Sequence, residues 1–351
     1  MTETLEIPTS VEQLTATWLT NFLGENGHDA SITAVTAEAV GTGQMAGSYR
    51  LTLEHSGPAD LPGTMVAKLA TGAPEQREFG SGVFRNEVRF YRDLASGFTV
   101  PMPQCYAATI SDPGTEFVLL LEDIDEAVQG DQIIGCTPAQ AESVAVAAAG
   151  LHAPRWNDAA LLEEMPLPGA AEREMMESIL EPMADVYRDR FSPDARSSAA
   201  IDWLVREAGD WLVAPLRNTA LIHGDLRVDN VLFGPSGEVT VIDWQTITTG
   251  NPLRDIAFLL STSLTTEDRR KHERGIVASY HRAVVTEGVA DYTLDECWDD
   301  YVANLIQAPL IIVFGSAAAQ PTERGTAMFD AMLSRSAAAI EDLVPGGLAG
   351  R

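Results

Sequence analysis

A single short β interval interrupts the last two thirds of the chain, where the sequence otherwise shows helical patterns. The interval spans residues 220–243 and contains the apolar runs VLF and VTV on either side of Gly-Pro-Ser-Gly at 234–237. A turn sequence between two β-branched runs predicts an antiparallel hairpin over 231–233 and 239–242. Because the two ends of a hairpin are neighbours, we expect Asn230 and Asp243 to come within about one strand spacing of each other.

The remaining residues predict two lobes of different character. The chain has 351 residues, more than one compact domain usually contains. Helices are expected from near Ser10 and over 78–96, and strand-like runs lie at 31–40, 48–55, 64–70 and 115–122. After residue 123 the helical patterns lie at 138–152, 171–190, 199–213, 266–287, 294–312 and 322–343. We therefore expect an α+β fold, with a β-rich N-terminal lobe (1–123) and a helical C-terminal lobe (124–351).

Composition excludes several classes of partner. The chain carries 23 basic against 51 acidic residues, a formal net charge of −28, which repels phosphate backbones and anionic membrane surfaces. We therefore expect neither a nucleic acid nor a membrane as partner. Three cysteines without a CxxC pair favour a reduced environment, and no secretory leader or long apolar run is apparent. These features predict a cytoplasmic protein.

Lysine is rare in this chain, so each lysine needs an explanation. The sequence has two, Lys68 and Lys271, and Lys68 ends the apolar run Met65-Val66-Ala67. An ammonium group there is costly unless it has an anionic partner, and Glu87 falls within the apolar stripe of the helix expected next. We predict a Lys68–Glu87 ion pair. The alternative is a surface lysine whose stem alone covers apolar surface.

Three oxygen-bearing side chains around the hairpin point to chemistry on a bound cation. Asp225 lies five residues before Asn230, and Asp243 follows thirteen residues after Asn230, at the end of an apolar strand. Asn and Asp in loops more often cap turns than bind metal. The three together at this spacing favour a hard cation such as Mg²⁺ held by Asn230 and Asp243. Asp225 is placed to accept a proton from a hydroxyl group near that cation.

The order His-Gly-Asp, Asn and Asp-Trp over residues 223–244 resembles the aminoglycoside phosphotransferase and choline kinase superfamily, which has a bilobal protein-kinase-like fold. The tripeptide Asp243-Trp244-Gln245 and the run GTGQ are closest to its ecdysteroid-kinase-like (CHK-like) branch. The resemblance implies that Asp225 is the catalytic base and that Asn230 and Asp243 hold Mg²⁺. It also implies that Arg227 neutralises the transferring phosphoryl group, although a surface arginine is an equal alternative.

The N-terminal half carries the residues that the resemblance assigns to ATP. Lys68 and Glu87 would grip and position the nucleotide phosphates, and Gly43, Gly47 and Ser48 would lie in a loop that covers them. The alternative for this glycine-containing run is an ordinary hairpin turn. Glu122 would lie in the hinge that pairs with the adenine edge, or in a simple connector.

Other residues have structural readings of comparable weight. Asp255 would brace the catalytic loop or cap the helix that begins there, and His152 is expected to be a packed histidine. Asp255 follows only twelve positions after Asp243, which leaves little room for a peptide platform.

The sequence therefore predicts an ATP- and Mg²⁺-dependent kinase for a hydroxylated small molecule: an aminoglycoside, amino alcohol, sugar or sterol-like compound. The rival is a catalytically silent nucleotide-binding regulator or scaffold of the same fold. The sequence fixes neither the acceptor nor the oligomeric state.

Overall fold

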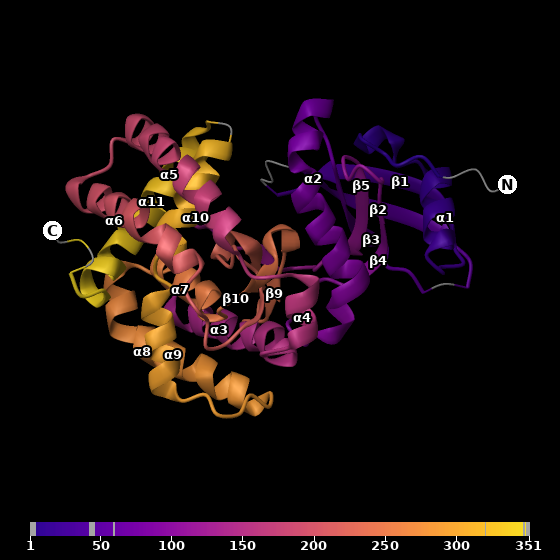
Figure 1. Cartoon of the computed structure of the whole chain (residues 1–351). Helices are drawn as coiled ribbons and strands as arrows, with labels where there is room; N and C mark the ends of the chain where they lie inside the picture. The colour runs from indigo at the N-terminus through magenta and orange to yellow at the C-terminus, as the bar shows by residue number, and fades with distance from the viewer. Residues whose placement is uncertain (1–4, 42–45, 59, 320, 347, 349–351) are drawn as a thin grey trace. The chain divides into compact units, whose positions relative to one another are not determined.

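The computed structural model describes residues 5–41, 46–58, 60–319, 321–346 and 348, which form two compact units (Figure 1). Unit 1 comprises Met1–Gly97, Met102–Glu126 and Ile242–Thr246; unit 2 comprises Phe98–Pro101, Ala127–Val241 and Ile247–Arg351. Unit 1 is built on an antiparallel sheet and unit 2 mainly from helices, so the predicted α+β class is confirmed.

The sheet of unit 1 has five strands in the order β1-β2-β3-β5-β4, and each neighbouring pair is antiparallel. The strands are β1 (Ser31–Ala39), β2 (Gly47–Ser56), β3 (Thr64–Leu69), β4 (Cys105–Ile110) and β5 (Phe117–Glu122). Strand β4 was missed by the sequence prediction, because its residues CYAATI show no regular alternation of apolar and polar side chains.

The two helices of unit 1 pack on opposite faces of this sheet. Leu19 and Phe22 of α1 (Ala16–Glu25) share a core with Val118 and Leu120 of β5. Phe84 of α2 (Pro74–Arg89) instead lies 4.8 Å, centroid to centroid, from Phe117. Since successive strand residues point to opposite faces, β5 is buried on both sides.

Helices α1 and α2 both begin at residues different from those that the sequence pattern predicts. Thr15, rather than Ser10, caps α1, because its Oγ1 accepts a hydrogen bond from the Trp18 backbone N–H at 3.2 Å. Helix α2 begins four residues earlier than expected, at Pro74, and is extended by one π-helical turn over Phe90–Leu94. Proline suits a first helical position, since its missing N–H has no intrahelical partner there.

Unit 2 contains nine helices among its described residues: α3 (Pro138–His152), α4 (Ala159–Glu164), α5 (Ala170–Phe191), α6 (Ala195–Leu212), α7 (Leu253–Ser263), α8 (Thr266–Thr286), α9 (Leu294–Ala303), α10 (Gln307–Ala318) and α11 (Glu323–Leu343). The single helix predicted over 294–312 is therefore wrong, because the chain breaks between α9 and α10. Figure 1 shows α5, α10 and α11 gathered in one part of the unit.

Two small sheets position the loops of unit 2. Strand β7 (Ala220–Ile222) pairs with β10 (Thr248–Gly250), and β6 (Val128–Gln129), β8 (Val231–Phe233) and β9 (Val239–Val241) form the second sheet. The predicted hairpin is confirmed: β8 and β9 are antiparallel, with Val231 opposite Val241.

The segment Leu294–Ala318 is apolar enough to be a candidate membrane span, with a mean hydropathy of 1.6 over its best window. It covers α9, the break and α10, and 61% of that window is buried inside the structure. Burial of this kind is what helices in a protein core show.

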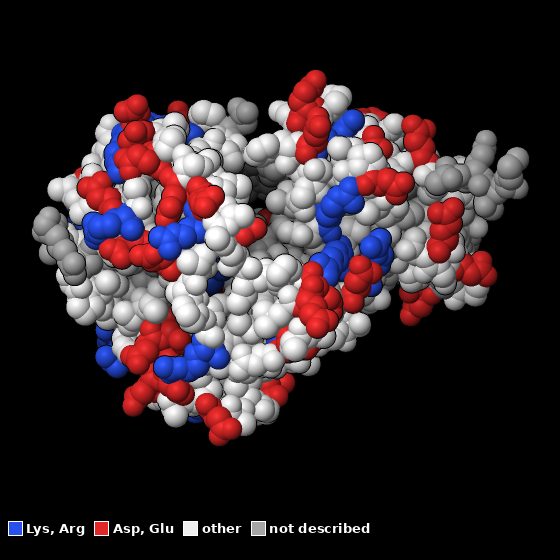
Figure 2. All heavy atoms as spheres, viewed as in Figure 1, with Lys and Arg blue, Asp and Glu red and all other residues white. Residues whose placement is uncertain are grey.

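The acidic excess does not gather into one patch on the face shown in Figure 2, where red carboxylates are interspersed with blue basic side chains. Arg188, for example, forms ion pairs with Glu181, Asp185 and Asp202, whose side chains are all more than half exposed. Exposed pairs of this kind contribute little stability.

Candidate active site

The loop that follows β7 is held in place by a buried carboxylate. Asp255, in the first turn of α7, accepts hydrogen bonds from the backbone N–H groups of His223 at 2.7 Å and Gly224 at 2.9 Å. Gly224 has φ 82°, a left-handed conformation that glycine adopts without strain. The prediction that Asp255 braces this loop is confirmed.

The Asp255 carboxylate is also in contact with a buried histidine. His152 Nε2 lies 3.1 Å from Asp255 Oδ2, and its Nδ1 lies 2.8 Å from the hydroxyl of Tyr280. All three side chains are fully buried. Burial by itself raises the pKa of Asp255. The hydrogen bond and charge of His152, together with the charge and backbone N–H of His223, outweigh burial and lower that pKa. His152 is thus the packed histidine that the sequence predicts.

Asp225 is the partly exposed carboxylate that this loop presents. Its Oδ2 accepts a hydrogen bond from Asn230 Nδ2 at 2.9 Å, and Arg227 Nε lies 3.2 Å from its Oδ1. Its side chain is 19% exposed, so a substrate can reach it. The structure therefore brings together three predicted site residues, Asp225, Arg227 and Asn230; their chemical roles stay predictions.

A second carboxylate on the loop was missed by the sequence analysis. Asp229 is buried; its Oδ1 accepts a hydrogen bond from the backbone N–H of Gln132 at 2.8 Å and one from Arg324 at 3.3 Å, and its Oδ2 lies 3.6 Å from Arg227. Asp229 thus ties Arg227 to α11 and to the loop after β6. The sequence pattern singles out the neighbouring Asn230. It contains no feature that distinguishes Asp229 from an ordinary aspartate in a turn.

Gln307 is another residue that sequence reasoning missed. Its Nε2 donates to the backbone carbonyl of Gly224 at 2.9 Å, and its Oε1 accepts from Arg254 Nε at 2.9 Å. The side chain is fully buried at the start of α10. A glutamine 83 residues from its partner leaves no signal in a single sequence.

Unit 1 holds the predicted ion pair. Lys68 Nζ lies 2.7 Å from Glu87 Oε1, and Glu87 is 1% exposed, so the Lys68–Glu87 pair is confirmed. Lys68 also lies 2.8 Å from Asp243 Oδ1, a contact that the sequence analysis did not anticipate. Burial by itself lowers the pKa of Lys68, but the two carboxylates outweigh it and raise that pKa, which keeps the ammonium charged.

Two neighbours of Asp243 join the same cluster. Gln245 Nε2 donates to Glu87 Oε2 at 3.2 Å, which satisfies the second oxygen of that buried carboxylate. The ring of Trp244 stacks on Phe90 of the π-helical turn, with centroids 3.9 Å apart and planes 11° apart. Asp243 has φ 68°, a left-handed conformation in which aspartate is enriched. The segment after β9 is therefore tightly held within unit 1.

The structure describes only some of the other residues that are predicted to contact the nucleotide. Gly43 lies outside the described residues. At Gly47, a Cβ would approach Tyr49 within 2.8 Å and Thr71 within 2.9 Å, so any larger residue would have to displace these side chains. Ser48 pairs with Lys68 across β2 and β3. A phosphate-covering role for Gly43, Gly47 and Ser48 stays a prediction.

Glu122, expected in the hinge, is bound at the end of the sheet. Its Oε2 accepts from the Gln104 backbone N–H at 3.1 Å, and its own N–H donates to the Gln104 carbonyl at 2.8 Å. The carboxylate therefore anchors the start of β4, and contact with adenine stays a prediction.

The donor set suits the implied Mg²⁺. Asn230 Nδ2 donates to both the backbone oxygen and Oδ2 of Asp225, which leaves its Oδ1 as the atom for a cation. Asp243 is 36% exposed. Among the described residues no group of three or more His, Cys, Asp or Glu is arranged to hold a metal. Mg²⁺ is commonly bound by one or two carboxylates, with water and phosphate oxygens completing its shell, so the oxygens of Asn230 and Asp243 are of the kind it takes. The separation of Asn230 from Asp243 stays a prediction.

The fold is similar to that of solved phosphotransferases. A choline kinase from Cryptosporidium parvum gives a TM-score of 0.56 at 12% identity, over 90% of this chain and 91% of that chain. A macrolide 2′-phosphotransferase type I gives 0.51 at 17% identity, over 93% and 98%. At these identities the likeness shows the fold alone.

Curated relatives match over a part of their own length. Acyl-CoA dehydrogenase family member 11 of Gallus gallus is 27% identical over 174 residues, which cover 47% of this chain and 21% of that protein. The Homo sapiens protein of the same name is 30% identical over 168 residues, or 46% and 20%. The chain spans about a fifth of these relatives, so the dehydrogenase in their name is a property of much longer proteins.

A family model decides the classification. The model of the phosphotransferase enzyme family matches residues 37–292, well over half of the chain, and the matched range contains Lys68, Glu87, Asp225, Asn230 and Asp243. The chain therefore belongs to the phosphotransferase enzyme family.

Proposed function

We propose that this small-molecule phosphotransferase moves the γ-phosphoryl group of ATP to a hydroxyl group, with Mg²⁺ as cofactor. The observation that carries the proposal is Asp225, a partly exposed carboxylate whose loop is braced by the fully buried Asp255. A carboxylate that is fixed in this way and remains accessible suits a general base.

In the proposed reaction, Asp225 accepts the proton of the acceptor hydroxyl as that oxygen forms a bond to the γ-phosphorus. The bond from the γ-phosphorus to the bridging oxygen breaks, and its electron pair leaves with ADP. Arg227, 3.2 Å from Asp225, supplies positive charge where the phosphoryl group carries negative charge. Asn230 keeps the Asp225 carboxylate oriented through its 2.9 Å hydrogen bond.

The nucleotide is assigned to the cluster in unit 1. Lys68 supplies an ammonium for the phosphates, and Glu87 keeps it in place, because the pair is 2.7 Å apart and largely buried. When Mg²⁺ is bound, it neutralises phosphate charge; Asn230 and Asp243 are the residues we propose to hold it.

The acceptor class is inferred from the enzymes that share the fold. Their names include choline kinase and macrolide 2′-phosphotransferase, so amino alcohols and macrolides belong in the first panel, with aminoglycosides, sugars and sterols beside them. The acidic excess of the chain, 51 against 23, is compatible with a cationic acceptor.

The test measures ATP consumption and phosphorylated product across this panel, for the wild type and for Asp225→Asn. The substitution keeps shape and removes the basic oxygen, so turnover should fall by about a thousandfold while ATP binding persists. Asp202→Asn, at an exposed ion pair, is the matched control and should retain activity. Wild-type turnover in Asp225→Asn would refute the assignment. Tight ATP binding without turnover on any alcohol would favour the silent regulator instead.

A further inference from the structure

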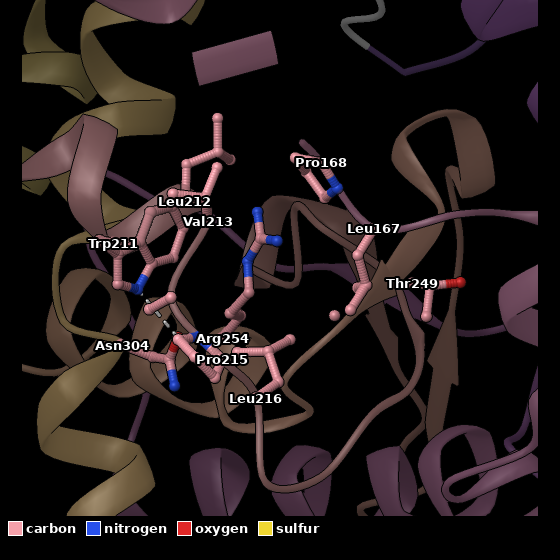
Figure 3. A pocket seen from close by; sticks show the side chains of 12 residues that line it. Leu167, Pro168, Trp211, Leu212, Val213, Pro215, Leu216, Thr249, Arg254 and Asn304 are labelled. Carbon is pink, nitrogen blue, oxygen red and sulfur yellow. Dashed lines mark hydrogen bonds between the residues drawn. The ribbon is translucent and has the colours of Figure 1, made fainter. Parts of the chain in front are cut away.

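A cavity of about 160 Å³ lies within unit 2, and its described lining includes none of the residues assigned to catalysis (Figure 3). Its walls come from the chain before α5, the end of α6 and the residues after it, β10, the start of α7 and the residue after α9. Most of the lining side chains are apolar, and Ala214 and Pro215 at its edge are exposed. Small molecules therefore have a route into the cavity.

Arg254 is the one charged side chain among the described residues that line this cavity. Its Nε donates to Gln307 Oε1 at 2.9 Å, and its guanidinium carbon lies 4.8 Å from the ring centroid of Trp211. Figure 3 shows its two terminal nitrogens pointing into the space between Leu212 and Pro168. These two nitrogens are the charged part of a site whose polar lining also includes Thr249 and Asn304.

The charge of Arg254 has no carboxylate partner within 4.0 Å among the described residues. By contrast, Arg269, which is 1% exposed, forms ion pairs with Glu273 and Asp342. Burial lowers the pKa of Arg254 to about 10 against the charge of Asp255, which raises it, and the guanidinium is still protonated at neutral pH. Asp255 acts on Arg254 through its charge alone, and a partly buried cation without a direct ion pair is costly, although the chain has 51 acidic residues from which to supply one. A ligand that brings the anion would offset this cost.

The shape and polarity of the cavity restrict that ligand. A guanidinium group presents paired N–H donors that match the two oxygens of a carboxylate. Asn304 adds at most one further N–H, because its Nδ2 already donates to the Asp300 carbonyl at 2.7 Å, and its Oδ1 accepts from Trp211 at 3.2 Å. With Arg254 as the single cation of the described lining, the site balances one negative charge, which suits a carboxylate better than a phosphate dianion. A cavity of about 150 Å³ is known to accommodate benzene, so the ligand body is of that order.

We propose that this cavity is a binding site for a small organic carboxylate with a compact apolar body, held by a salt bridge to Arg254. The site goes beyond the proposed phosphotransfer, because binding here needs neither ATP nor a hydroxyl group. It is nevertheless connected to the catalytic loop: Gln307, which accepts from Arg254, donates to the carbonyl of Gly224, the residue before Asp225.

The test titrates the full chain with benzoate by calorimetry and by ligand-observed NMR, with benzamide as the neutral compound of the same shape. We expect benzoate to bind and to raise the unfolding temperature, and benzamide to bind at least tenfold more weakly. Equal binding of the two compounds, or no binding of benzoate to the folded chain, would overturn the proposal.

Variants locate the site. Arg254→Met keeps the length of the stem and removes the charge, so benzoate affinity should fall at least tenfold. Leu212→Trp keeps Arg254 and fills the cavity, so it should abolish binding by another route. Arg206→Met removes an exposed arginine from the same helix as Leu212 and should bind as the wild type does. Unchanged affinity in both Arg254→Met and Leu212→Trp would place benzoate elsewhere and refute the site.

The source of the carboxylate is distinguished by turnover. If the acceptor itself supplies it, hydroxy acids should be phosphorylated and Arg254→Met should raise their KM. If a separate effector supplies it, benzoate should change the kcat of an uncharged acceptor in the wild type and leave Arg254→Met unaffected. Benzoate binding is measured without turnover, so it stands or falls apart from the proposed kinase activity.

Discussion

Lys68 Nζ donates to Oδ1 of Asp243 at 2.8 Å, although 175 positions separate the two residues in the chain. Glu87 lies 2.7 Å from the same nitrogen, so one ammonium is shared by two carboxylates. We expect that sharing to control both the stability of unit 1 and its hold on a nucleotide.

Lys68→Met should destabilise the chain by about 3 kcal/mol, because it leaves the buried Glu87 without its cation. Adding Glu87→Gln to that variant should recover a large part of the loss, since the second change removes the uncompensated charge. ATP affinity should stay low in both. Denaturant unfolding and nucleotide titration separate the two effects. Arg92→Met, at a pair exposed by 54% and 44%, is the control and should change stability by less than about 0.5 kcal/mol. A double variant less stable than Lys68→Met would contradict the buried-pair argument.

Asp255→Asn should lower the unfolding free energy by about 3 kcal/mol, because an amide cannot accept from His223, Gly224 and His152 together. Turnover should fall as well, since the loop that carries Asp225 loses its brace. Amide hydrogen exchange at His223 and Gly224 would report the loosened loop directly. Unchanged protection of both amides would show that the loop is held by other contacts.

The contribution of Asp255 should also depend on pH. Its pKa is lowered below the usual 3.8, so the folded state binds this proton less readily than the unfolded state does. Stability from Asp255 is therefore present above the usual value and is lost as pH falls through the lowered one. We expect the gap in unfolding free energy between wild type and Asp255→Asn to be constant above about pH 5 and to shrink in stronger acid. If the difference in unfolding free energy between the two proteins widened in acid, the pKa of Asp255 would be raised in the folded state and not lowered.

The cysteines should react slowly in the folded chain. Burial raises the pKa of Cys105, Cys136 and Cys297 each to about 12, so the reactive thiolate is scarce at pH 8. All three are free. Labelling with iodoacetamide should be slow in buffer and complete in denaturant, as read by mass spectrometry. Rapid labelling of one cysteine in the folded chain would identify a thiol whose surroundings open.

Local features of the candidate site were predictable from the sequence, and long-range ones were not. The hairpin of β8 and β9 follows from a turn sequence within a dozen residues, and the Lys68–Glu87 pair follows from a costly charge beside an amphipathic helix. Gln307 and Asp229 act through partners about a hundred residues away, and no periodicity records such contacts.

The same limit applies to the fold. Helices α3, α5 and α8 match their expected ranges within two residues. The break between α9 and α10 falls in a continuous apolar pattern, where Asn304 closes the first helix through a bond from its side chain to the Asp300 carbonyl. Such an ending depends on one side chain, so periodicity alone predicts a single longer helix.

The five residues Ile242–Thr246 belong to unit 1, although the chain on both sides of them belongs to unit 2. During synthesis, residues 1–126 therefore emerge without the carboxylate that Lys68 contacts and without the indole that covers Phe90. The ribosome must translate more than a hundred further residues before those partners exist. A fragment that ends at residue 126 would never acquire these two partners. The connectivity of the chain therefore requires that unit 1 is completed only after most of unit 2 has been synthesised.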